Sequence, residues 1–118
     1  MKVFLKISQY LNPYNGFAFD SKWQNAEALQ DFYFFEIDNH SDKYLVQQVV
    51  KLIEENEAIV ILFEMQADTV VGNIPFLLRK MVRHKKKVII IYNGEHHHIN
   101  KIITPFFCIK KDFEITKE

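Results

Sequence analysis

The chain has very little cysteine and glycine, and each shortage excludes a class of protein. Its 118 residues include one cysteine, Cys108, so no disulfide forms within the chain, and we expect the reducing cytoplasm as its compartment. The 3 glycines, Gly16, Gly72 and Gly94, lie far apart. Dinucleotide-binding and phosphate-binding loops need clustered glycines, so the sequence predicts neither kind of loop.

The chain also lacks an excess of charge and a long apolar run. Lys and Arg together number 15, as do Asp and Glu, which gives a formal net charge of zero. Nucleic-acid-binding domains normally carry a basic excess, so we expect no nucleic-acid partner. No apolar run approaches the roughly 20 residues that cross a bilayer, so we expect no membrane partner. Residues 1–7 contain a lysine within their apolar run and predict a strand, not a signal peptide.

Catalytic and metal-binding signatures are missing as well. Ser8 and Gln9 end the first predicted strand without carboxylates, which excludes a receiver-type phosphoacceptor. His96 and His98 stand close in sequence, but on a helix they point about 200° apart and do not share a ligand set. Glu95 and His98 would share a face, yet no closed set of four ligands can be assembled around them. We therefore expect no metal and no cofactor, and a function without catalysis is our first hypothesis.

Three short runs of β-branched, aromatic and aliphatic residues predict buried strands. They lie at residues 32–37, 58–63 and 88–92. Strands that are apolar on both faces are typical of a sheet that helices cover on both faces. Residues 2–7 and 106–109 predict two further strands, the last of them at an edge of the sheet.

Stretches with helical periodicity separate these strands. The predicted helices lie at residues 22–30, 43–56, 74–84 and 95–104. The clearest is the second, whose apolar residues recur at helical spacing from Leu45 to Ile53. The alternation predicts one α/β domain over residues 1–118. We expect a three-layer α/β/α sandwich of about five mainly parallel strands with helices on both faces.

Polar residues follow three of the predicted strands, at the edge where open α/β sheets bind their ligands. Asp38 follows the second strand, Glu64 and Asp68 follow the third, and Glu95 follows the fourth. Residues of these types also form turns and cap helices in proteins where they bind nothing. The sequence therefore leaves open whether they form an acidic site or only shape the loops.

The order of elements from Phe32 to Ile109 resembles that of a STAS domain, the module of anti-sigma-factor antagonists. Asp68 and Thr69 stand where that family has an Asp-Ser pair, and Gly72 lies one place later than the family's glycine. The resemblance implies that Thr69 is a phosphorylatable hydroxyl, and that a phosphate there prevents a protein partner from docking. It also implies a first strand antiparallel to the second, an exposed surface at Asp68 and Thr69, and no deep pocket.

Two functions remain open. The first is a non-enzymatic regulatory or protein-interaction module with a phosphorylation-sensitive switch at Thr69, as the resemblance implies. The second is a flavodoxin-like domain that binds a small ligand, or acts as a minor enzyme, at an acidic site on the strand carboxyl ends. The residues of that site would be Asp38, Glu64, Asp68 and Glu95.

The aromatic content predicts an interface. The chain has 11 phenylalanines, more than a small core obviously needs, and exposed aromatic side chains are enriched where proteins meet. We therefore expect a protein partner or a homodimer, with Tyr10, Tyr14 and Phe17 in the interface.

Overall fold

The computed structural model describes residues 2–10 and 30–110 of the chain. Within these residues the strands are β1 (Lys2–Ser8), β2 (Phe32–Asp38), β3 (Ala58–Glu64), β4 (Val88–Asn93) and β5 (Phe107–Lys110). The described helices are α2 (Lys43–Glu55), α3 (Ile74–Met81), its 3-10 continuation η2 (Val82–Lys87), and α4 (His97–Ile102). Each of the predicted strands is present with its ends shifted by no more than a residue or two. The helix predicted at 22–30 lies, except for its last residue, outside the described residues.

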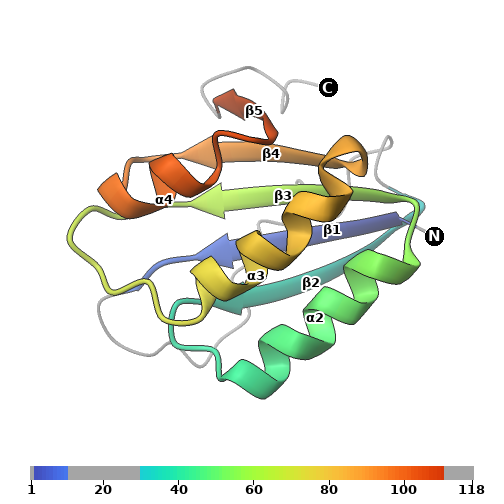
Figure 1. The fold of residues 1–118 in the computed structure, drawn as a ribbon, viewed down its shortest axis with the longest axis horizontal. Coiled ribbons are helices and arrows are strands. Elements are labelled where there is room, and N and C mark those ends of the chain that lie inside the picture. Colours follow the sequence, from blue (N-terminus) through green and yellow to red (C-terminus); the bar gives the residue numbers. More distant parts are fainter. Residues whose placement is uncertain (1, 11–29, 111–118) are drawn as a thin grey trace.

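All five described strands form one parallel sheet in the order β2-β1-β3-β4-β5 (Figure 1). The chain moves from β1 to β2 in one direction across the sheet and from β2 onward in the other. This is the strand order of flavodoxin-like folds. The predicted α/β fold class with a mainly parallel sheet is confirmed.

The expected antiparallel pairing of the first two strands is wrong. Lys2 is aligned with Phe32 and Ser8 with Asp38, in parallel register along the whole of β1 and β2. Parallel neighbours need a crossover connection of a dozen or more residues, whereas a hairpin needs only a few. Residues 9–31 separate the two strands, and this length is compatible with the crossover that parallel pairing requires.

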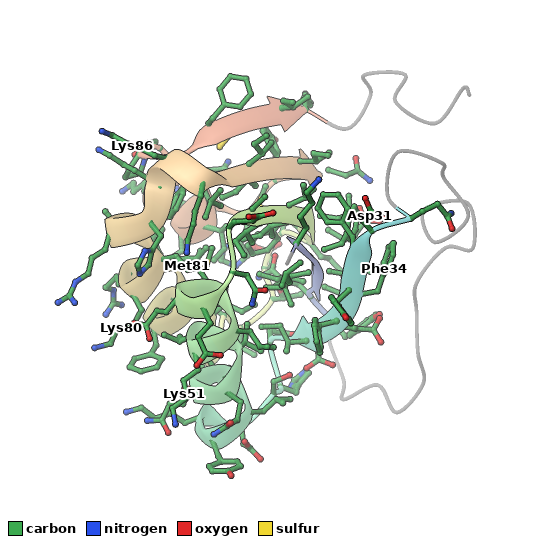
Figure 2. The ribbon with its side chains drawn as sticks, turned by 90° about the vertical axis from the view of Figure 1, so that its right-hand side faces the viewer. Asp31, Phe34, Lys51, Lys80, Met81 and Lys86 are labelled. Atoms are coloured by element: carbon green, nitrogen blue, oxygen red, sulfur yellow. The ribbon has the colours of Figure 1, made fainter. Side chains whose placement is uncertain are left out.

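Helices α2, α3 and α4 lie on one face of the sheet (Figure 1). Their apolar side chains form one cluster with the strand residues that point toward them, among them Val3, Leu5 and Ile7, all at most 1% exposed. On the other face, Phe4, Leu62 and Ile91 form a second buried cluster. Figure 2 shows Met81 on the helix side of the sheet and Phe34 on the opposite side. No helix among the described residues covers this second face, called the open face below.

Local signals explain where the helices begin and end. The Asp42 carboxylate accepts a hydrogen bond from the Leu45 backbone N–H at 2.8 Å and caps the start of α2. Helix α3 has proline in its first turn and is shorter than predicted, because the chain tightens into η2 after Met81. None of the helices in the described ranges is long and apolar enough to cross a membrane.

Candidate binding site at the carboxyl edge of the sheet

The parallel register places four polar side chains in one row at the carboxyl ends of the strands. Ser8 of β1 is aligned with Asp38 of β2 and with Glu64 of β3. Glu64 is aligned in turn with Asn93 of β4. Aligned residues of a parallel sheet point to the same face, and side chains two or four residues apart share that face. Since Phe4 belongs to the cluster on the open face, the row that contains Ser8 lies on the open face too.

The centre of this row coincides with the reversal in strand order. The connection after β1 leads to β2, whereas the connection after β3 leads away from it to β4. In open α/β folds such a reversal separates the loops that follow two neighbouring strands, and ligands bind in the crevice between these loops. In this chain the rule points to the ends of β1 and β3.

Ser8 is the last residue of β1 and Gln9 follows it, and each is only 4% exposed. The Gln9 backbone N–H donates to the Glu64 carbonyl at 3.2 Å, and the Gln9 side-chain Oε1 accepts from the Gln66 backbone N–H at 3.1 Å. The second contact fixes the orientation of the amide, because only an oxygen accepts from an N–H. Within the described part of the chain, the buried Gln9 Nε2 and Ser8 Oγ have no hydrogen-bond partner.

Asn39 ties three loops of the carboxyl edge together. It is 2% exposed, and its Oδ1 accepts from the Tyr10 backbone N–H at 2.8 Å. Its Nδ2 donates to the carbonyls of Tyr10 at 3.0 Å and Val70 at 2.8 Å. His40 Nε2 lies 2.9 Å from the same Tyr10 carbonyl, and because a carbonyl only accepts, this nitrogen carries the ring proton. Asp38 Oδ1 accepts from the His40 backbone N–H at 2.7 Å, so Asp38 helps to form the turn after β2.

His96 joins the loop after β4 to the loop after β3. Its Nδ1 accepts from the His98 backbone N–H at 3.2 Å and caps α4, while its Nε2 lies 2.8 Å from the Thr69 carbonyl. Both contacts together require a neutral ring with its proton on Nε2. The ring is therefore a buried link between loops. No group of three or more His, Cys, Asp or Glu side chains in the described ranges is placed to hold a metal ion.

Asp68 and Thr69 differ in their exposure. Asp68 is exposed and has a positive φ of 65°. Thr69 is 7% exposed, and its hydroxyl donates to the Gln66 carbonyl at 2.7 Å. The surface expected at these two residues is thus exposed only at Asp68, and a kinase reaches the Thr69 hydroxyl only after the loop opens.

The structure divides the predicted acidic residues between different places. Asp38 and Glu64 lie in the same row, with Ser8 between them. Glu95 lines a different pocket, beside β5. Strands β2 and β4 have two strands between them, which at a spacing of about 4.8 Å separates Asp38 from the end of β4 by about 14 Å. One small ligand therefore does not contact both Asp38 and the loop that carries Glu95.

Sequence reasoning passed over Ser8 and Gln9 because it examined them only for missing carboxylates. The sequence does contain a signal: two consecutive polar residues follow a predicted strand, residues 2–7, in which four of six residues are apolar. From the sequence, Gly94 is considered only for phosphate loops and Gly72 for these loops and for the resemblance to STAS domains, so the backbone contacts of either glycine are not predicted. Gly72 and Gly94 have positive φ angles of 55° and 85°, and a Cβ on either would overlap a backbone carbonyl, that of Asn39 or of Met65.

The substitution Gly72→Ala tests this close approach. We expect it to lower the free energy of unfolding by about 2 kcal/mol or more, because alanine strains the left-handed backbone and its Cβ overlaps the Asn39 carbonyl. Asp68→Gly is the matched control at another left-handed position, where we expect a change below about 1 kcal/mol. Urea denaturation measures both. Equal stability of Gly72→Ala and the wild type would contradict the packing of this loop against Asn39.

Comparison with known proteins adds no relative to this description. No protein-family model, no curated protein and no solved structure matches the chain. The resemblance to STAS domains therefore stays an interpretation of the sequence. What the carboxyl edge does must be argued from its own geometry and chemistry.

Proposed function

We propose that the chain is a small-ligand-binding α/β domain whose site is the crevice between the ends of β1 and β3. The observation that carries the proposal is the pair of buried groups, Ser8 Oγ and Gln9 Nε2, that lack a hydrogen-bond partner among the described residues. Buried polar groups are nearly always paired, and an unpaired one costs about 1–3 kcal/mol. Two such groups at the place where open sheets bind ligands support a site that a ligand completes.

The neighbouring side chains define the kind of ligand. Gln9 Nε2 offers N–H donors, and the Ser8 hydroxyl both donates and accepts. The carboxylates of Asp38 and Glu64 lie on either side of Ser8 in the row and accept hydrogen bonds. A matching ligand is a small polar molecule that presents carbonyl or hydroxyl oxygens to Ser8 and Gln9, and N–H groups to the carboxylates.

The proposal is binding without catalysis. A serine nucleophile needs a general base within hydrogen-bond reach of its hydroxyl. In the described ranges no hydrogen bond joins Ser8 Oγ to any group, so no base activates it. Ser8 is accordingly assigned the role of a recognition residue.

The substitution Ser8→Ala separates this role from a structural one. We expect the ligand-free protein to become more stable by about 1 kcal/mol, because the change removes a buried hydroxyl that lacks a partner. Ser41→Ala is the matched control: Ser41 Oγ accepts from the Asp38 backbone N–H at 3.0 Å, so its removal lowers the free energy of unfolding. Urea denaturation compares the two variants.

The same variants serve in a ligand screen. Amide spectra of ¹⁵N-labelled protein are recorded with a library of small polar molecules. Expected hits shift the amides of Gln9 and Gln66 in the wild type and in Ser41→Ala, but not in Ser8→Ala. A Ser8→Ala variant that loses stability, as Ser41→Ala does, contradicts the proposal, and so does a hit that binds both variants equally.

A protein-interaction module is the second candidate, and one observation favours it. Phe107 of β5 is 64% exposed and is aligned with Ile89 of β4, which is 39% exposed, on the open face. Adjacent exposed apolar side chains are typical of surfaces that a partner covers. The interface expected at Tyr10, Tyr14 and Phe17 stays a separate prediction: Tyr10 is half-buried, and the other two lie outside the described residues.

We propose a second copy of the chain as the occupant of this apolar pair, and Phe107→Ser tests it. The variant loses the larger apolar side chain of the pair. We therefore expect its self-association, measured by sedimentation velocity, to be weaker than that of the wild type by about tenfold or more. The control is Tyr44→Ser, which removes a 71% exposed aromatic side chain from α2. A wild type that stays monomeric at high concentration contradicts the homodimer. Equal self-association of the wild type, Phe107→Ser and Tyr44→Ser also contradicts it.

The phosphorylation-sensitive switch at Thr69 stays a proposal, and the burial of its hydroxyl gives it a specific form. A phosphate on Thr69 would break the hydrogen bond to Gln66 and force the loop open. Thr69→Glu imitates the charge, and we expect it to lower the free energy of unfolding by about 2 kcal/mol or more, because a carboxylate replaces a buried hydroxyl. Thr69→Ser keeps the hydroxyl and serves as control in urea denaturation. A Thr69→Glu variant as stable as Thr69→Ser contradicts a switch that acts by opening the loop.

A further inference from the structure

A pocket lies on the helix side of the sheet, between α4 and the β4–β5 edge. Its volume is about 410 Å³, at the lower end of the range for small-molecule sites. Tyr92 of β4 and the β5 residues Cys108 and Lys110 form one wall, and Asn100 of α4 forms part of another. Tyr92 and Cys108 also pack against the apolar cluster under the helices. The pocket is thus separated from the Ser8 crevice by the sheet itself.

The floor of the pocket is apolar. Ile103 is 5% exposed and Phe106 is 6% exposed, and both line the cavity. The Cys108 thiol beside them donates weakly to the carbonyls of these two residues, at 3.5 Å each. Burial raises the pKa of the Cys108 thiol, so the thiol is mainly protonated at neutral pH, and Cys108 forms part of the floor without being an activated nucleophile.

The rim of the pocket carries charges of opposite sign. Glu95, from the loop after β4, and Lys110, at the end of β5, both line the cavity and are exposed. Among the described residues neither charge takes part in a hydrogen bond or an ion pair. Asn100 and Tyr92 add an amide and a phenol to the same lining. An apolar floor below one carboxylate and one ammonium group matches a molecule with an apolar body and both charges at its head.

We propose that this pocket binds a free amino acid with an apolar side chain. The ligand ammonium group faces Glu95, the ligand carboxylate faces Lys110, and the side chain lies over Ile103 and Phe106. A ligand with a carboxylate but no ammonium group brings a negative charge near the Glu95 carboxylate. A ligand with an ammonium group but no carboxylate brings a positive charge near the Lys110 ammonium group. The zwitterion satisfies both.

Titration of the full ¹⁵N-labelled chain with L-phenylalanine tests the proposal. We expect shifts of amides between residues 92 and 110. N-acetyl-L-phenylalanine lacks the ammonium group and L-phenylalaninamide lacks the carboxylate, so each binds at least about threefold more weakly, the size expected for one exposed ion pair. As a second readout, L-phenylalanine slows alkylation of Cys108, the one cysteine of the chain, by iodoacetamide.

Charge-neutral variants assign the two ends of the ligand. Glu95→Gln weakens binding of L-phenylalanine and of L-phenylalaninamide but does not weaken binding of the N-acetyl compound. Lys110→Gln weakens binding of L-phenylalanine and of the N-acetyl compound but does not weaken binding of L-phenylalaninamide. The control Lys101→Gln changes an exposed lysine of α4 that does not line the pocket, and leaves all three ligands unaffected. Ser8→Ala also leaves them unaffected, so failure here and failure at the Ser8 crevice are distinguishable.

Three outcomes overturn the inference. The first is the absence of both amide shifts and alkylation protection at about 10 mM ligand, a concentration that still detects a Kd of about 1 mM. The second is equal affinity for the zwitterion and its two singly charged analogues. The third is binding that neither Glu95→Gln nor Lys110→Gln changes.

Discussion

The position of β1 between two parallel neighbours is the constraint on which the rest of the structure depends. β1 hydrogen-bonds to β2 on one side and β3 on the other, and its apolar residues are buried toward both faces. A central strand has no exposed edge, so the residues that end it are enclosed by the loops of both neighbours. Ser8 and Gln9 are buried for this reason, and not because they are apolar. The same pairing decides where the strand order reverses, which is where open α/β sheets bind their ligands.

Backbone-directed hydrogen bonds give the carboxyl edge its shape. Asn39, Gln9 and His96 each use a side chain to bond main-chain groups of another loop. Loops that cross the surface between strands leave main-chain groups that a helix or ladder would otherwise pair, and these side chains supply the missing partners. Most of the polar residues at this edge are thereby committed to the fold. Among the described residues, Ser8 Oγ and Gln9 Nε2 are side-chain groups at this edge that no such hydrogen bond uses, and they are the groups that the proposed ligand would contact.

The apolar runs of the sequence were sufficient to locate the described strands, because a strand buried on both faces has a composition that few other elements share. The pairing of β1 with β2 was not predictable in the same way. Whether the two strands pair in parallel or antiparallel depends on the connection between them, residues 9–31. The composition of the strands does not indicate this direction. The positive φ of Asp68 and the neutral, doubly bonded ring of His96 are also tertiary properties. The sequence contains three consecutive histidines, at 96–98, but it does not indicate that the His96 ring lies 2.8 Å from the carbonyl of the distant Thr69.

The alternation of side chains along β4 links the two proposed sites while keeping them apart. Asn93 ends the polar row on the open face, whereas its neighbour Tyr92 lines the pocket under α4. The intervening sheet prevents direct contact between ligands on the two faces, and the shortest covalent path between the two sites runs along the chain from Asn93 to Glu95. Gly94 lies at the middle of that path with no room for a side chain beside the Met65 carbonyl. Because this turn has no room to shift, a ligand at one site does not displace the residues of the other, which favours two sites that bind independently.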